Sequence, residues 1–395
     1  MSTPRRIAVL IETSNAYGRG LLRGVVAYVR EHAAWSVYYA EQGRGDAPSW
    51  LADWDGDGIV ARIENKKIAN AIVKSKVPAV DVSAARLVRS IPWVETNDAA
   101  IAKLVAEHFL KRGFKHFAFC GDGRFNWSKW RCELFQKALR LAGYSCAVYQ
   151  PTEFKDERVE QQIAAIGAWL EKLPKPVGVM ASYDIRAQHV LAAALSHSLA
   201  VPDQVAVVGV DNDELLCDLC SPPLSSVLPN SQKAGYEAAR LLDRMISGER
   251  IPAEAHLIDP LRLVVRQSSD VLAVHDRDIA LAMHFIRRHA CEGINVSDLL
   301  KAVPLSRRVM ESRFKKLLGT TPHDEIVRVK LNRVKQLLTE TRLSLSEIAA
   351  RTGFEHLEYL TVFFRENVGL PPSHFRTQAR RMENASIQSE EPEAN

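Results

Sequence analysis

The sequence predicts an α/β sensor of two doubly wound lobes, followed by an all-α domain that carries two helix-turn-helix units. Three observations support this prediction. Short apolar runs alternate with helical patterns up to about residue 270, a helix-turn-helix pattern occurs twice between Asn295 and Arg376, and a basic excess lies on that repeat. Alternation of strands and helices is typical of parallel sheets, whereas tandem helix-turn-helix units are typical of DNA readers.

The length and composition of the chain agree with this organisation. A chain of 395 residues is too long for one ordinary core and predicts two or three domains. With 47% hydrophobic and 25% charged residues, its composition is that of a globular protein. No apolar run is long enough to cross a membrane, and the N-terminus enters a strand pattern without a leader. We therefore expect a cytoplasmic, nucleoid-associated protein without a membrane partner.

The first part of the chain alternates strand and helix patterns. Unalternated apolar runs predict strands buried on both faces at 7–11, 35–40, 58–61, 79–82, 116–120, 146–149, 178–180 and 205–210, and 260–265 resembles a final strand. Helical patterns lie between them at 21–31, 99–111, 130–141, 159–170 and 185–195. This alternation favours two lobes with a ligand cleft between them over one large sheet.

Polar side chains follow four of the predicted strands. Ligands of open α/β sheets bind beyond the carboxyl ends of the strands. The candidate effector-binding residues are Asn15, Tyr17, Arg19, Trp127, Arg131, Asp184, Asp211 and Asn212. Carboxylates, amides and guanidinium groups can hold vicinal hydroxyls, and an indole ring can cover the C–H face of a sugar. The set therefore predicts a sugar pocket, the alternatives being that Asp184 only caps a helix and that Tyr17 is a core residue.

Other ligand classes have weak support in the sequence. The glycines around Gly18 and Gly20 lack the G-x-G-x-x-G spacing of a dinucleotide loop. We find no catalytic Ser, His and Asp set and no metal-ligand spacing, so we expect neither an enzyme nor a cofactor or metal. Cys217 and Cys220 form a C-x-x-C pair, which we interpret as two helical thiols, with a metal or redox site as the alternative.

The charge is distributed unevenly along the chain. Residues 277–381 contain 19 Lys and Arg against 11 Asp and Glu, whereas residues 1–276 contain 33 against 32. Residues 382–395 carry four Glu and no basic residue. A basic excess on one small domain is expected of a nucleic-acid binder.

The repeat pairs residues 49 apart before its turn and 50 apart after it, as in Asp298 with Glu347 and Phe314 with Phe364. A capping box is expected at the start of the first helix of each copy. A helix beginning at Pro322 should join the copies. The domains are predicted as a sensor at 1–268, a linker at 269–277, a DNA-binding domain at 278–381 and an acidic, disordered tail at 382–395.

The second helix of each copy should enter the major groove of operator DNA. The DNA-binding candidates are Arg307, Arg308, Glu311, Ser312, Lys315 and Lys316 in the first copy, and His356, Glu358, Tyr359 and Val362 in the second. Arg307 and Arg308 are the strongest candidates for guanine contacts, and Arg313, Lys315 and Lys316 for phosphate contacts. The inward stripes are predicted as Val309, Met310, Phe314 and Leu317, and as Leu360, Phe363 and Phe364, with Leu357 outward.

Residues 278–379 resemble the double helix-turn-helix domain of the AraC/XylS regulators. The resemblance rests on L-S-R-R-x-x-x-x-R-F-K-K-x-x-G-x-x-P at 305–322, S-x-x-E-I-A-x-x-x-G-F at 344–354 and F-x-x-x-x-G-x-x-P at 364–372. Pro304 stands where that family often has Gly, and the outward face of the second reading helix is unusual. The operator sequence therefore does not transfer.

Residues 6–268 resemble the periplasmic-binding-protein-like core of LacI/GalR regulators through V-A-V-V-G-V-D-N at 205–212 and P-P-L-S-S-V at 222–227. The bacterial xylose operon regulators join such a core to an AraC-type domain. Further segments that resemble theirs are 15–19, 57–61 and 288–294. By this resemblance Arg131, Asp211 and Asn212 match effector-holding positions, with Asp184 and the loop 15–19 as further candidates.

The resulting hypothesis is a DNA-binding transcriptional regulator, an activator of xylose or pentose catabolism genes controlled by a sugar in its N-terminal cleft. Its expected partners are an operator, a xylose-like effector, a second copy in a homodimer and, for an activator, RNA polymerase. One alternative is constitutive DNA binding with an N-terminal domain that only dimerises. Another is a different small-molecule effector.

Overall fold

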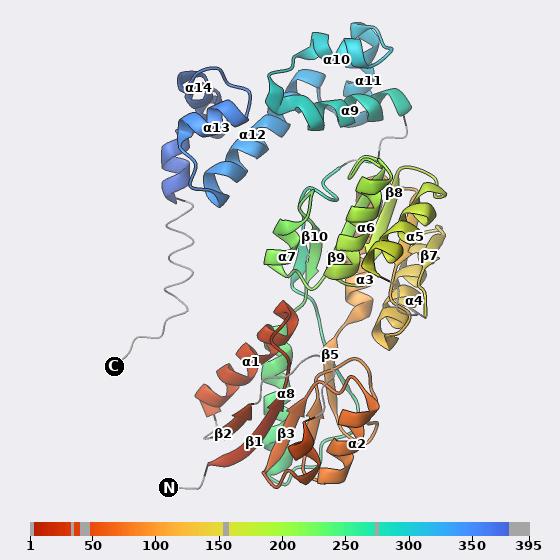
Figure 1. Cartoon of the computed structure of the whole chain (residues 1–395), viewed down its shortest axis with the longest axis vertical. Coiled ribbons are helices and arrows are strands. Elements are labelled where there is room, and N and C mark those ends of the chain that lie inside the picture. The colour runs from red at the N-terminus through yellow and green to blue at the C-terminus, as the bar shows by residue number, and fades with distance from the viewer. Residues whose placement is uncertain are drawn as a thin grey trace. The chain divides into compact units, whose positions relative to one another are not determined.

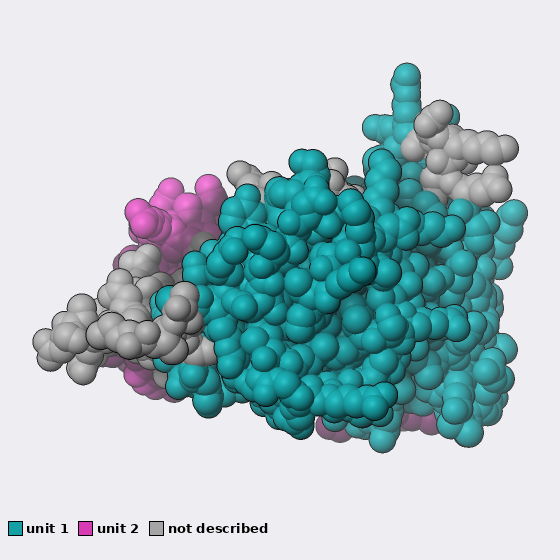
Figure 2. Space-filling view, turned by 90° about the horizontal axis from the view of Figure 1, so that it is seen from below, with its two compact units in different colours: residues 1–273 teal, residues 274–395 magenta. Residues whose placement is uncertain are grey.

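The computed structural model describes residues 4–32, 35–39, 48–152, 158–271, 273 and 276–378. The chain forms two compact units, residues 1–273 and 274–395, which Figure 2 distinguishes by colour. The predicted tail at 382–395 lies outside the described residues, as do parts of the predicted linker. None of the described helices has the length and apolar character needed to span a membrane.

The first lobe of the N-terminal unit is a parallel six-stranded sheet in the order β11-β5-β4-β3-β1-β2 (Figure 1). Its strands are β1 (Arg5–Leu10), β2 (Trp35–Tyr39), β3 (Gly58–Ala61), β4 (Ala79–Asp81), β5 (Trp93–Thr96) and β11 (Ala255–Ile258). Its helices are α1 (Ala16–His32), α2 (Lys66–Ser75) and α8 (Ser231–Ile246), with a short 3-10 turn at Ser49–Asp53. Leu21, Val25, Leu241 and Leu242 are among the helix residues that join the buried apolar core of this lobe.

The second lobe has the sheet order β12-β10-β9-β8-β6-β7, parallel except for β12. Its strands are β6 (His116–Cys120), β7 (Cys146–Tyr149), β8 (Val177–Ala181), β9 (Val205–Val210), β10 (Ser225–Leu228) and β12 (Arg262–Val264). Its helices are α3 (Asp98–Lys111), α4 (Asn126–Leu141), α5 (Val159–Glu171), α6 (Asp184–Ser196) and α7 (Glu214–Leu219). Two buried clusters fill the two faces of this sheet.

The chain passes between the lobes three times, after β5, β10 and β11. The apolar pattern did not predict these three strands. They are short, and polar residues such as Glu95, Ser225 and Ser226 interrupt them. Hydrogen bonds satisfy these buried polar side chains. The Ser225 hydroxyl, for example, donates to the carbonyl oxygen of Arg266 at 2.8 Å.

The glycines of α1 have a packing role. A Cβ at Gly20 would lie 1.9 Å from Ser231 Oγ, and one at Gly24 would lie 2.0 Å from the carbonyl oxygen of Gln232. Both glycines therefore allow α1 and α8 to approach closely, as Figure 1 shows. This packing explains Gly20 and Gly24 without a nucleotide, and Gly18 is explained by the carbonyl oxygen of Glu12, which would lie 2.1 Å from a Cβ there.

The C-terminal unit contains α9 (Arg277–His289), a 3-10 turn at Ala290–Glu292, α10 (Val296–Ala302), α11 (Arg307–Leu318), α12 (Pro322–Glu340), α13 (Leu345–Arg351) and α14 (Leu357–Val368). The two repeats form separate buried clusters, one around Phe314 and one around Phe364. The connecting helix α12 runs from one to the other, as predicted.

Local capping defines the two copies. Asn295 and Asp298 form a capping box at the start of α10, and Ser344 and Glu347 form one at the start of α13. The reading helices α11 and α14 both end at a glycine with positive φ, Gly319 at 72° and Gly369 at 82°. Glycine adopts this left-handed conformation without the steric cost that a Cβ would add.

Candidate functional site

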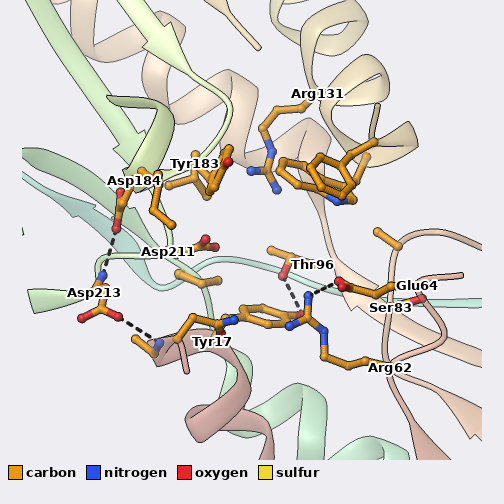
Figure 3. A pocket seen from close by; sticks show the side chains of 18 of the residues that line it. Tyr17, Arg62, Glu64, Ser83, Thr96, Arg131, Tyr183, Asp184, Asp211 and Asp213 are labelled. Atoms are coloured by element: carbon orange, nitrogen blue, oxygen red, sulfur yellow. Dashed lines mark hydrogen bonds and ion pairs between the residues drawn. The ribbon is translucent and has the colours of Figure 1, made fainter. Parts of the chain in front are cut away.

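The two lobes of the N-terminal unit enclose a cavity of about 790 Å³ at the carboxyl ends of their strands. Figure 3 shows Arg131, Tyr183 and Asp184 of the second lobe facing Tyr17, Arg62 and Glu64 of the first. Seven of the eight predicted effector residues line it, namely Asn15, Tyr17, Arg19, Trp127, Arg131, Asp184 and Asp211. These residues are distant in the sequence, but they all follow parallel strands and therefore lie at one cavity beyond the carboxyl ends of those strands.

Arg131 on α4 is fixed by a buried carboxylate at the start of α3. Its Nε donates to Asp98 Oδ1 at 2.8 Å, and its guanidinium also donates to the carbonyl oxygen of Ser182. Burial raises the pKa of the Asp98 carboxyl, and the charge of Arg131 lowers it. Arg131 is therefore held rigidly at the cavity wall before any ligand arrives.

An aromatic wall lies beside this pair. The Trp127 ring stacks on Phe125 with ring centroids 5.2 Å apart and meets Tyr183 edge-on at 5.5 Å. The Arg131 guanidinium lies 5.4 Å from the Trp127 ring centroid. Such a wall can cover the C–H face of a sugar ring while the guanidinium donates to a hydroxyl.

The first lobe contributes Tyr17 and Arg62. Thr96 Oγ1 donates to the Tyr17 hydroxyl at 3.3 Å, and burial raises the pKa of Tyr17. Arg62 pairs with Glu12 and, at 2.6 Å, with Glu64. The Tyr17 hydroxyl is thus a neutral donor or acceptor, next to a guanidinium already paired with carboxylates.

Asp184 and Asp211 form the acidic corner. Asp184 accepts from Ser226 Oγ at 2.6 Å and from the backbone N–H of Asp213 at 2.9 Å. Burial, together with the charge of Asp211, raises the pKa of the Asp184 carboxyl. A Cβ at Gly209 would lie 2.3 Å from Asp184 Oδ1, so glycine is required for this approach. Asp184 thus holds the strand ends together as well as lining the cavity.

The backbone at Asp211 has an unusual conformation. Its φ is 110°, and that of Asn212 is 45°. Positive φ at successive non-glycine residues is strained and persists only where surrounding contacts hold it. The strained turn places the Asp211 side chain at the cavity.

The same turn directs the Asn212 side chain away from the cavity, unlike the other predicted effector residues. Asn212 is buried and does not line the cavity. Its Oδ1 accepts from Arg266 Nη1 at 2.8 Å, and its backbone N–H donates to Ser226 Oγ at 3.0 Å. Asn212 therefore ties the turn to the sheet.

Asp213 connects the two lobes. Its Oδ2 accepts from the backbone N–H of Ala16, at the start of α1, at 3.1 Å, and lies 3.3 Å from Arg19 Nη2. The carboxylate thereby offsets the partial positive charge of the helix N-terminus. Arg19, in the first lobe, is thus held at the cavity by its ion pair with Asp213 of the second lobe.

Sequence reasoning missed Arg62, Glu64 and Asp98 as cavity residues. Arg62 follows β3 directly, so the rule that found Asp211 would have found it. Asp98 follows β5, a strand that the apolar pattern did not predict. Tertiary structure was needed to identify it.

Cys217 and Cys220 are both buried and free of disulfide bonds. Burial raises the pKa of both thiols, that of Cys220 to about 11. The described residues contain no group of His, Cys, Asp and Glu suited to a metal ion.

The reading helix α11 presents its predicted polar face to solvent. Arg307, Arg308, Glu311, Ser312, Lys315 and Lys316 are all exposed, and Met310 and Phe314 are buried. Two residues of the predicted inward stripe are misplaced, because Val309 is 39% and Leu317 45% exposed. Only the positions that face α9 and α12 are covered in this small domain.

Arg313 is not placed as a phosphate contact. Its Nη1 lies 3.0 Å from Asp276 Oδ2 and 3.3 Å from Asp278 Oδ2. Asp276 also caps α9, accepting from the backbone N–H of Ile279 at 3.2 Å. Arg313 therefore connects α11 to the start of the domain.

The face of α14 differs in chemistry. His356, Glu358, Tyr359 and Val362 are exposed, with Tyr359 at 61%. Leu360 and Phe364 are buried as predicted, whereas Leu357 is partly buried against the core and not outward. With the repeat offset of 50 residues, Leu357 and Glu358 occupy the positions of Arg307 and Arg308, and Tyr359 and Val362 occupy those of Val309 and Ser312.

Three family models match the chain in order. Residues 6–98 match the XylR N-terminal domain, 106–269 a periplasmic binding protein-like domain and 299–378 a helix-turn-helix domain. The Xylose operon regulatory protein of Escherichia coli (strain K12) is 33% identical over 379 residues, which cover 94% of this chain and 96% of that protein. The chain belongs to the xylose operon regulator family.

Two further comparisons agree with this membership. The Xylose operon regulatory protein of Haemophilus influenzae is 28% identical and covers 94% of this chain and 98% of its own length. A solved structure of the xylose-binding transcription activator XylR superposes with a TM-score of 0.80 at 31% identity, covering 95% of this chain and 98% of that one. Members of this family are transcriptional regulators and not enzymes, so the predictions of fold and function class are confirmed.

Proposed function

We propose that this regulator binds xylose or a related pentose in the cavity of its N-terminal unit and activates sugar catabolism genes. A sensor at 1–268 controls a DNA-binding domain at 278–381 in this proposal. The similar solved structure is that of a xylose-binding transcription activator, which supports both the sugar and the sign of regulation.

The state of the cavity arginines is the observation that supports an uncharged, hydroxylated ligand. Each of the arginines among the cavity residues is paired with a carboxylate, as in Arg131 with Asp98 at 2.6 Å and Arg124 with Asp122 at 2.6 Å. A phosphorylated ligand would need cationic charge that the carboxylates already neutralise. Hydroxyls can instead accept from the remaining N–H groups and donate to carboxylate oxygens.

The effector contacts follow from this geometry. Arg131, Asp98 and Asp211 bind sugar hydroxyls, Trp127 covers a ring face, and Asn15, Tyr17 and Asp184 complete the polar wall. Arg19 acts through Asp213 at the junction of the lobes. A sugar that contacts both lobes favours one lobe arrangement, and about 1–3 kcal/mol of such coupling is typical of allosteric regulators.

On DNA, we propose that α11 and α14 enter successive major grooves of an operator, with the protein acting as a homodimer and contacting RNA polymerase. Arg307 and Arg308 read guanine, and Lys315 and Lys316 bind phosphates. Glu311 and Ser312 lie on the same exposed face of α11. His356, Glu358, Tyr359 and Val362 form the second reading face.

A sugar panel scored by thermal shift tests the proposal. Pentoses, hexoses and their phosphate esters are added to the full chain, because ligand at 100 times its dissociation constant stabilises a protein by about 2.7 kcal/mol. A shift with xylose or another pentose, and none with its phosphate ester, is expected. No shift with any sugar, from folded protein, contradicts the proposal and favours a sensor that only dimerises.

A further inference from the structure

Glu95 is a buried carboxylate of the first lobe that lines the cavity. It lies on β5, and only 5% of its side chain is exposed. Arg86, in the segment between β4 and β5, donates from Nε to Glu95 Oε2 at 3.2 Å and from Nη2 to the other carboxylate oxygen. Burial raises the pKa of the Glu95 carboxyl, and the hydrogen bond and charge of Arg86 oppose that rise. The bidentate pair therefore fixes the orientation of a carboxylate at the cavity wall.

The same guanidinium also contacts the second lobe. Arg86 Cζ lies 4.2 Å from the ring centroid of Trp130, on α4, and 5.7 Å from that of Trp93, on β5. Planar guanidinium groups stack on aromatic rings, and tryptophan is the most favourable aromatic partner for a cation. Arg86 thus connects a cavity carboxylate of the first lobe to a helix of the second lobe.

The contacted helix is the one that carries the aromatic wall of the cavity. Trp130 directly precedes Arg131 on α4 and follows Trp127 by three residues, which is less than one helical turn. Both Trp127 and Arg131 line the cavity. Because a helix moves as a unit over so short a distance, the contact of Arg86 with Trp130 also sets where these two side chains stand relative to Glu95.

The backbone of Arg86 has an uncommon conformation. Its φ is 52°, in the left-handed region that few residues other than glycine adopt. Such a conformation persists where surrounding contacts hold it, and the pair with Glu95 and the stacking on Trp130 are contacts of this kind. The fold thus accepts a local cost in free energy at the residue that joins the two lobes.

We propose that Arg86 is a positioning residue of the effector response, which stabilises the sugar-binding arrangement of the two lobes through Trp130. A contact between the lobes is lost or weakened when they separate, so its free energy adds to that of the sugar in favouring the closed arrangement. Neither Arg86 nor Trp130 lines the cavity, so both act through Glu95 and α4. This inference rests on the proposed sugar-sensing function and names residues that set its affinity.

Calorimetric titration of the full chain with D-xylose tests the inference. If D-xylose gives no shift in the sugar panel, the pentose that does takes its place. Trp130→Leu keeps an apolar side chain and the pair of Arg86 with Glu95 but removes the aromatic ring, so we expect sugar binding to weaken about threefold to tenfold. Trp130→Phe, which retains an aromatic ring, should recover most of the affinity. Trp169→Leu, which removes an aromatic contact with Tyr149 inside the second lobe, is the control and should leave the affinity unchanged.

A double-mutant cycle separates the contact between lobes from local neutralisation of Glu95. Arg86→Gln should weaken sugar binding at least as much as Trp130→Leu, and the double variant should bind no more weakly than Arg86→Gln alone, because the stacking is absent from both. Arg89→Gln, which removes an exposed charge from the same segment, should have no effect. Unchanged affinity of Trp130→Leu, or losses that multiply in the double variant, overturns the inference.

The two proposals fail in different ways. A parent chain that binds the sugar, with a Trp130→Leu variant that binds it equally well, removes only the role of Arg86. Absence of heat with every sugar of the panel, from folded parent chain, contradicts the sugar-sensing function and this inference with it.

Discussion

Arg131 in the cavity and Arg308 on helix α11 are arginines in opposite environments, although Arg307 on the same helix pairs with Glu311 at 3.0 Å. Arg131 in the cavity is buried and bound to Asp98, with 9% and 13% of their side chains exposed. Arg308 on α11 is exposed, and it forms no ion pair within the described part of the chain. A buried guanidinium must be neutralised by its own fold, whereas an exposed one keeps its donors for a partner. The comparison separates an arginine that the fold has already neutralised from one whose donors are available to a partner.

The largest expected effect is on the buried pair. Arg131→Ala leaves the Asp98 carboxyl buried without its counter-charge, so we expect a loss of about 3–5 kcal/mol in the free energy of unfolding. Urea unfolding of the full chain measures it. Lys74→Ala, which breaks an exposed pair with Asp53 at 3.3 Å, is the control and should cost at most about 1 kcal/mol. Equal losses for both variants would show that Arg131 is not structurally coupled to Asp98.

An intermediate effect is expected on α11. Arg308→Ala should weaken operator binding by about 1–3 kcal/mol at one base-pair position, because no guanidinium then donates to both acceptors of the guanine. Titration against a set of single-base operator variants measures the loss, and thermal stability should not change. Arg333→Ala on α12 removes the same charge from an exposed position and serves as the control. Uniform weakening on all sequences would instead identify Arg308 as a phosphate contact.

The smallest effect is expected on α14, where Leu357 and Glu358 stand at the positions of Arg307 and Arg308. Tyr359→Ala should reduce operator affinity by about 0.8 kcal/mol, the equivalent of one methylene-sized contact with DNA, and the salt dependence should stay constant. Binding at several salt concentrations checks both points. A loss of affinity at Tyr359 that exceeds the loss at Arg308 would reverse the proposed division of labour between the two reading helices.

Much of the DNA-binding unit could be predicted because its signals are local. The capping boxes at Asn295 and Ser344 and the helix-ending Gly319 and Gly369 act within a few residues of where they stand. The errors in this unit concerned which apolar side chains are buried. Val309 and Leu317 are apolar and were predicted in the inward stripe, yet they are exposed because a small domain cannot bury every apolar side chain of its helices.

The cavity was predictable in outline, since residues that follow parallel strands must gather at one edge. The individual residues that line the cavity could not all be predicted from the sequence. Asp98 follows a strand whose pattern is interrupted by Glu95, and Asn212 follows the best-defined strand yet turns away to Arg266.

The sequence by itself determined the two-part architecture, the tandem helix-turn-helix units and the sheet edge at which the cavity lies, because periodicity, caps and charge are properties of neighbouring residues. Only the tertiary structure decided which polar side chains face the cavity and which guanidinium groups are already neutralised. It also decided that Arg86 lies against Trp130 of the other lobe. Those properties depend on pairs such as Arg131 with Asp98, which meet when the second lobe folds, and Ala16 with Asp213, which meet only when both lobes have folded.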